Sequence, residues 1–165
     1  MKDFSIYLND HLAGSVGALE MLDDMIAAQK ERPLEKFLTT LRNDIESDQA
    51  DLKRLIEELG IEESPVRKAG AWVAEKFSRV KLRIGDTGGA NLALLQSLES
   101  LSLGIAGKRS LWRTLIAVTK STPQLFRVDF PRLEQRATDQ FKRVEQQVQE
   151  IAGKIFSAEL NELAN

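Results

Sequence analysis

The sequence contains no cysteine among its 165 residues. This absence excludes a disulfide framework, a thiolate zinc site and a cysteine nucleophile. Histidine occurs once, as His11, so no cluster of histidines can hold a metal. Fully apolar runs are only a few residues long and the N-terminus has no signal-peptide pattern. We therefore expect a cytoplasmic protein of bacterial type with no integral membrane segment.

The composition that is present is typical of a globular protein. Hydrophobic residues make up 42% of the chain and charged residues 29%, values that argue against a disordered chain. The formal net charge of -2 provides no overall attraction to nucleic acid. The length suits a single domain over residues 1–165, long enough to bury a core.

Apolar residues recur at helical spacing through most of the chain, and the four prolines mark the interruptions. Ser64 and Pro65 together form a helix-start signal, and the glycine cluster at 85–90 predicts a loop. The sequence therefore predicts an all-α fold. Its helices are expected at 4–29, 33–59, 65–83, 90–120 and 130–157.

Each of the four longer helices carries a continuous apolar face, here called its seam, and two seams contain polar residues. Asp48 occupies a seam position of the 33–59 helix where leucine would be expected. Ser15 lies within the seam of the first helix, and His11 lies at its edge. In an antiparallel hairpin that turns near residues 31–32, residues whose numbers sum to about 63 lie level. Ser15 should therefore face Asp48.

We interpret His11, Ser15 and Asp48 as a buried polar cluster in which Asp48 accepts a hydrogen bond from Ser15 or His11. If His11 is the partner, its pKa should be raised. Two alternatives stay open: a surface-facing His11 with a half-exposed Asp48, or a metal-binding or catalytic role. A serine nucleophile is disfavoured because these side chains point into a packed seam that offers no oxyanion hole.

The connection between the 33–59 and 90–120 helices determines the topology. About 30 residues separate them, far more than a tight turn needs. A helix of ~18 residues within this connection would span roughly 27 Å, most of the length of a bundle. The chain can thus return to its starting end before the next helix begins. Two antiparallel hairpins joined by a long helical crossover form a four-helix bundle of the ferritin-like kind.

In helix order, in crossover placement and in the stretches YLNDHLAGSVGALEML and LRNDIESDQADLKRL, the chain resembles the ferritin-like superfamily. The resemblance is to its small, stress-associated bacterial members. Di-iron proteins of this kind need a carboxylate on each of two helices and a Glu-x-x-His on each of the other two. The nearest equivalents here begin at Glu46 and Glu134, and both lack the histidine. The resemblance therefore implies the fold without its di-iron centre, with no metal or other cofactor expected.

Two further features concern surfaces. The predicted 65–83 helix carries a basic stripe, which would suit phosphate or an anionic membrane surface but which solvated charges also explain. The 90–120 helix has a second apolar stripe, to be covered either by the crossover helix or by a second subunit. The basic stripe comprises Lys68, Trp72, Lys76, Arg79 and Arg83.

From the sequence we expect a non-enzymatic structural or interaction module. Its expected partners are a second copy of the chain and an unidentified protein. One alternative is a carboxylate metal-binding protein of the same fold that stores or oxidises iron. The other is a binder of nucleic acid or an anionic surface through the basic stripe.

Overall fold

A computed structural model describes residues 2–63, 90–119, 121–122 and 125–163. Four long helices account for most of these residues, which confirms the all-α prediction. The helices are α1 (Lys2–Ala28), α2 (Leu34–Glu58), α4 (Ala90–Thr119) and α5 (Phe130–Leu163). The helix predicted at 65–83 lies outside the described residues. None of the described helices combines the length and the hydropathy needed to cross a lipid bilayer.

Local sequence signals explain where the helices begin and end. The α2 helix ends two residues before Gly60, whose φ of 63° is left-handed and therefore suits glycine. The backbone N–H groups of Gly60 and Ile61 close the helix by donating to the carbonyls of Glu57 and Ile56. Asp129 caps α5, because its side chain accepts a hydrogen bond of 3.1 Å from the backbone N–H of Arg132.

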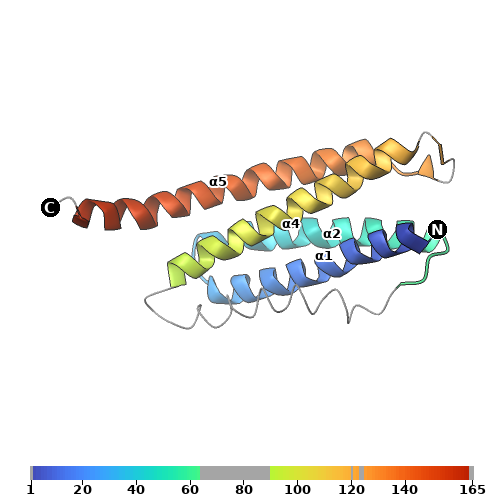
Figure 1. Cartoon of the computed structure of the whole chain (residues 1–165). Coiled ribbons are helices and arrows are strands. Elements are labelled where there is room, and N and C mark those ends of the chain that lie inside the picture. The colour runs from blue at the N-terminus through green and yellow to red at the C-terminus, as the bar shows by residue number, and fades with distance from the viewer. Residues whose placement is uncertain (1, 64–89, 120, 123–124, 164–165) are drawn as a thin grey trace.

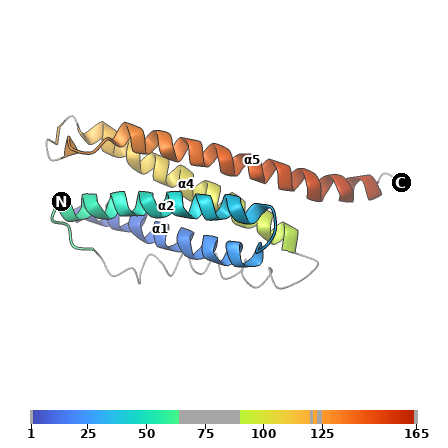
Figure 2. The ribbon, with the colours of Figure 1, turned by 180° about the vertical axis from the view of Figure 1, so that it is seen from behind.

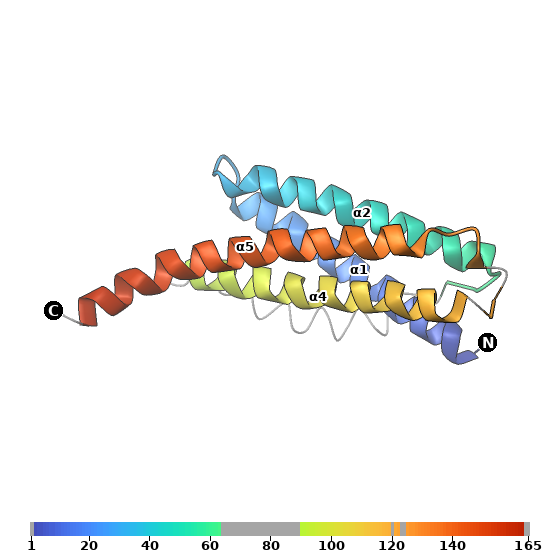
Figure 3. The ribbon, with the colours of Figure 1, turned by 90° about the horizontal axis from the view of Figure 1, so that it is seen from above.

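The four helices form a bundle of two antiparallel hairpins, α1 with α2 and α4 with α5 (Figures 1 and 2). The α2 and α4 helices run in the same direction, because α4 begins at the end of the bundle where α2 also begins. Figure 3 shows the α4–α5 hairpin lying across the α1–α2 hairpin. A fold with this order of directions requires the long connection that the sequence predicts between α2 and α4.

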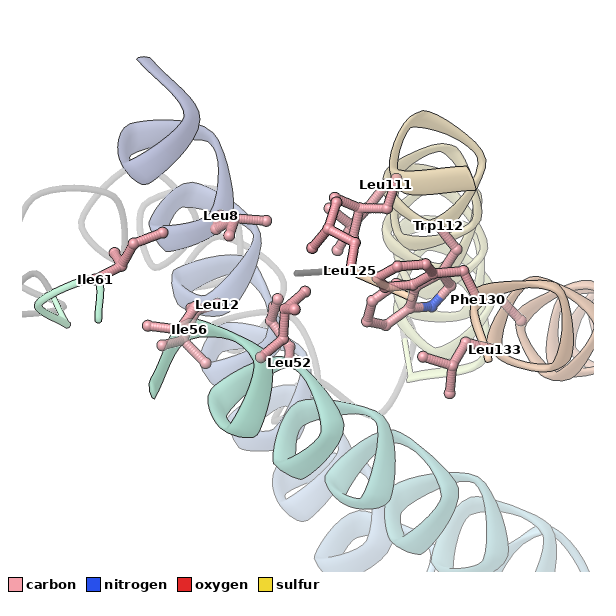
Figure 4. Packing of buried hydrophobic residues seen from close by; sticks show 13 residues of the cluster. Leu8, Leu12, Leu52, Ile56, Ile61, Leu111, Trp112, Leu125, Phe130 and Leu133 are labelled. Carbon is pink, nitrogen blue, oxygen red and sulfur yellow. The ribbon is translucent and has the colours of Figure 1, made fainter. Parts of the chain in front are cut away.

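The core consists of two clusters of apolar side chains, one in each half of the bundle. The first surrounds Trp112, whose indole stacks on the ring of Phe130 at a centroid distance of 6.2 Å (Figure 4). The second is built from aliphatic residues and methionine and includes Met25, Leu41 and Val144. Leu41 and Val144 belong to the predicted seams, as do most of the buried residues, whereas Met25, Leu111 and Leu133 do not, so the helical periodicity identified the core in part.

The α5 helix is longer than predicted and extends beyond the other described helices (Figures 1 and 3). Its contribution to the second apolar cluster ends at Ile151. Beyond that point Phe156 and Leu160 are 40% and 63% exposed. The predicted end at residue 157 was wrong because helix propensity continues after the seam has lost its packing partners.

Candidate functional site

Asp48 lies at the centre of a polar network between the two apolar clusters. Its side chain is only 1% exposed, so the predicted burial is confirmed. The α2 seam turns the carboxylate inward because Ile45 and Leu52, on either side of it, both pack in the core. An ionised carboxylate in such a place needs strong partners, and these come from α4 and α5.

Lys108 on α4 and Gln140 on α5 hold one oxygen of Asp48. The Lys108 ammonium group donates to Asp48 Oδ2 and to Gln140 Oε1. Gln140 is fully buried, and its Nε2 donates to the same Asp48 Oδ2 at 2.9 Å. Three side chains from three helices therefore satisfy one another in a closed triangle.

Arg136 on α5 holds the other oxygen of Asp48. Its Nη2 forms an ion pair with Asp48 Oδ1 and a hydrogen bond to Asp51 Oδ2. The contact with Oδ1 is one of charge, because its geometry is not that of a hydrogen bond. Asp51 also pairs with the exposed Arg54 at 3.4 Å. The carboxylates of Asp48 and Asp51 balance the cations of Lys108 and Arg136, so this part of the core is neutral.

Burial and charge act in opposite directions on the cations of this network. Burial lowers the pKa of Lys108, and the adjacent Asp48 carboxylate opposes that shift. Burial also acts against the charge of Arg136, but its hydrogen bond to Asp51 and the charge of Asp48 raise its pKa overall. Arg136 is thus held firmly as a cation, whereas the lysine depends on Asp48.

Ser15 and His11 take no part in this network, contrary to the predicted hydrogen bond. Ser15 Oγ donates to the Leu12 carbonyl at 2.6 Å and accepts from Gln49 Nε2 at 2.9 Å. Among the described residues, no hydrogen bond joins either side chain to Asp48. The predicted register of the hairpin was close, because Gln49 is the direct neighbour of Asp48. The α2 helix is rotated so that Gln49 faces α1 while Asp48 faces α4 and α5.

His11 has an environment that opposes its charge. Its ring meets the edge of Tyr7 at a centroid distance of 4.8 Å, and Tyr7 donates a hydrogen bond to Thr114 on α4. Burial lowers the pKa of His11, although the nearby Asp10 carboxylate acts in the other direction. A raised pKa was expected only if His11 paired with Asp48, and this condition is not met because the two side chains do not interact.

Sequence reasoning missed Lys108 and Gln140, although both leave a recognisable signal. Lys108 lies between Ile105 and Trp112 in the α4 seam at the same helical spacing. Gln140 lies between the buried residues Ala137 and Val144 of α5, as Asp48 lies between the buried residues Ile45 and Leu52 of α2. Each of three seams thus has one polar position, and the three polar residues meet in space.

The other carboxylates considered as metal ligands have separate positions. Glu134 accepts a hydrogen bond of 2.9 Å from Arg113. Glu46 accepts one of 2.8 Å from Arg42, and Glu99 is exposed. Within the described ranges, no group of three or more histidine, aspartate or glutamate side chains could hold a metal ion. The basic stripe from Lys68 to Arg83 lies outside the described residues.

Comparisons of the chain with protein-family models, with curated proteins and with solved structures find no match. The geometry of the bundle and its central network therefore carry the functional argument. What this network can do chemically is bind three helices together and neutralise a buried carboxylate. Asp48 Oδ2 accepts from Lys108 and Gln140, and Asp48 Oδ1 lies against the Arg136 cation.

Proposed function

We propose that this protein is a ferritin-like bundle that works as a structural or interaction module, with no di-metal centre and no catalysis of its own. The observation that carries the proposal is the pairing of Asp48 with Lys108 and Arg136. A carboxylate that ligates a metal ion needs accessible oxygens, whereas Asp48 Oδ2 already accepts from Lys108 and the charge of Asp48 Oδ1 is already paired with Arg136. The direction of the helices supports the ferritin-like assignment.

We also propose that the protein acts as a homodimer that associates through apolar side chains that the described bundle does not cover. On α4, Leu92 and Leu103 are 40% and 76% exposed, and on α5 Phe156 and Leu160 are similarly open. Grouped apolar side chains on a surface favour association. A role in stress responses is proposed on the sequence resemblance alone.

Two measurements on the purified chain test this function. Ferrous iron added in air should oxidise at the same rate with and without the protein. Light scattering should give the mass of a dimer, about twice the 18.5 kDa of one chain. Protein-dependent iron oxidation would contradict the non-enzymatic assignment and favour the carboxylate metal protein. A monomer at all concentrations would contradict the homodimer.

A further inference from the structure

The ammonium group of Lys108 lies among oxygen acceptors in the interior of the bundle. It contacts Asp48 Oδ2 and Gln140 Oε1, which come from different helices. Asp48 and Gln140 are 2% and 0% exposed, and the Lys108 side chain is 15% exposed. Two acceptors from different helices thus contact the cation, as they would contact a bound ligand.

The acceptors are oriented by contacts that do not involve the lysine. The hydrogen bond from Gln140 Nε2 to Asp48 Oδ2, at 2.9 Å, fixes the side-chain amide so that its Oε1 faces the ammonium group. Arg136 holds the second oxygen of Asp48 from the other side. Ile45 and Leu52 anchor α2 in the core above and below the carboxylate. The oxygen pair should therefore persist without the Lys108 side chain.

We propose that these oxygens form a binding site for a primary ammonium ion, which the protein fills with its own Lys108. A free alkylammonium ion then binds when the lysine side chain is removed. The oriented acceptors suit the N–H donors of an ammonium group. A divalent metal ion would require about six oxygen ligands, and its double charge would be repelled by Arg136 more strongly than the single charge of an ammonium ion. This inference is independent of the proposed function.

Chemical rescue tests the site directly. Lys108→Ala removes the atoms from Cγ to Nζ, which together correspond to propylammonium. We expect the variant to melt at a lower temperature than the parent. Propylammonium chloride should raise its Tm saturably, by ~3–6 °C when the ligand exceeds its Kd about tenfold. Tetramethylammonium chloride is the matched control, since it has the same charge and no N–H donor, and it should have no such effect.

The parent and a double variant separate binding from a general effect of salt. Neither the parent nor Lys108→Ala combined with Asp48→Asn should gain the propylammonium-dependent shift. Equal shifts in all three proteins, or no shift in Lys108→Ala, would overturn the proposal. Stronger stabilisation of Lys108→Ala by Mn²⁺ than by propylammonium would overturn the choice of ligand class.

Two further measurements apply if Lys108→Ala does not fold. Refolding it in propylammonium should restore the helical circular dichroism, and failure to do so counts against the site. In the parent, acetic anhydride should modify Lys108 much more slowly than the exposed Lys142 and Lys154, as followed by mass spectrometry of peptides. Equal rates for the three lysines would show that the Lys108 ammonium group is not held in the interior.

Discussion

A buried carboxylate at a seam position that leucine normally occupies costs desolvation free energy. For Asp48 this cost is offset by its interactions with Lys108, Gln140 and Arg136. The gain from such a pair over an apolar replacement is small. The penalty for removing one partner is large, because the other charge stays buried. The value of Asp48 to this protein therefore depends on Lys108.

Changing Asp48 to leucine should consequently destabilise the fold, although it restores an apolar seam. We expect a loss of about 3 kcal/mol, at the low end for a broken buried pair, because Lys108 keeps Gln140 and some access to water. Asp48→Leu with Lys108→Met should lose clearly less than the two single variants together. Urea unfolding of the four proteins measures this coupling. Additive losses would mean that the two charges do not depend on each other.

The lowered pKa of His11 predicts how the free energy of unfolding depends on pH. Because burial lowers its pKa below the ordinary value of 6.5, the unfolded chain binds more protons than the folded chain as the pH falls through that value. The contribution of the neutral imidazole is therefore complete above pH 6.5 and is lost as the pH falls through the folded pKa.

A single imidazole makes this prediction simple to check. Titration by NMR should show the His11 resonance changing below pH 6.5. His11→Phe should reduce the pH dependence of urea unfolding in the same window. A midpoint at or above the ordinary value would show that His11 has an anionic partner.

Helix α4 offers two leucines that separate burial from helix propensity. Leu101 is 2% exposed and Leu103 is 76% exposed, although both lie in the same helical segment. Leu101→Ala should cost about 2–5 kcal/mol because it leaves a cavity in the core. Leu103→Ala should change the stability of the single chain by about 0.5 kcal/mol or less. Denaturant unfolding at low protein concentration compares them, and similar losses would show that the α4 seam has been misplaced.

Helix positions and seams could be predicted from sequence because they depend on local spacing. The hairpin register could also be predicted, since the α1–α2 turn is short and places Ser15 beside Gln49. The partners of Asp48 could not be predicted in the same way. A rotation of one residue around α2 decides whether the side chain faces α1 or α4, and tertiary packing sets that rotation. A comparison of the polar residues at the seam positions of all helices would have identified Lys108 and Gln140 as partners of Asp48.

The described helices expose large apolar side chains, among them Leu103 on α4 and Phe156 on α5, which leads to a prediction about assembly. Leu103→Glu on α4 and Phe156→Glu on α5 should each leave helical content unchanged, because both side chains lie outside the core. If either lies in the dimer surface, its variant should have a lower mass by light scattering. Ser110→Glu on the exposed part of α4 is a matched control for added charge. Dimers of unchanged stability in both variants would place the association surface elsewhere.

We propose that neutralisation of the interior carboxylate by the chain's own cations makes the bundle independent of metal. Elemental analysis of the parent protein, after incubation with ferrous iron and manganese and removal of free ions by gel filtration, tests this most directly. We predict metal far below one equivalent per chain, because Lys108 and Arg136 already occupy the oxygens of Asp48. Stoichiometric iron or manganese, lost on changing Asp48 to asparagine, would contradict the account.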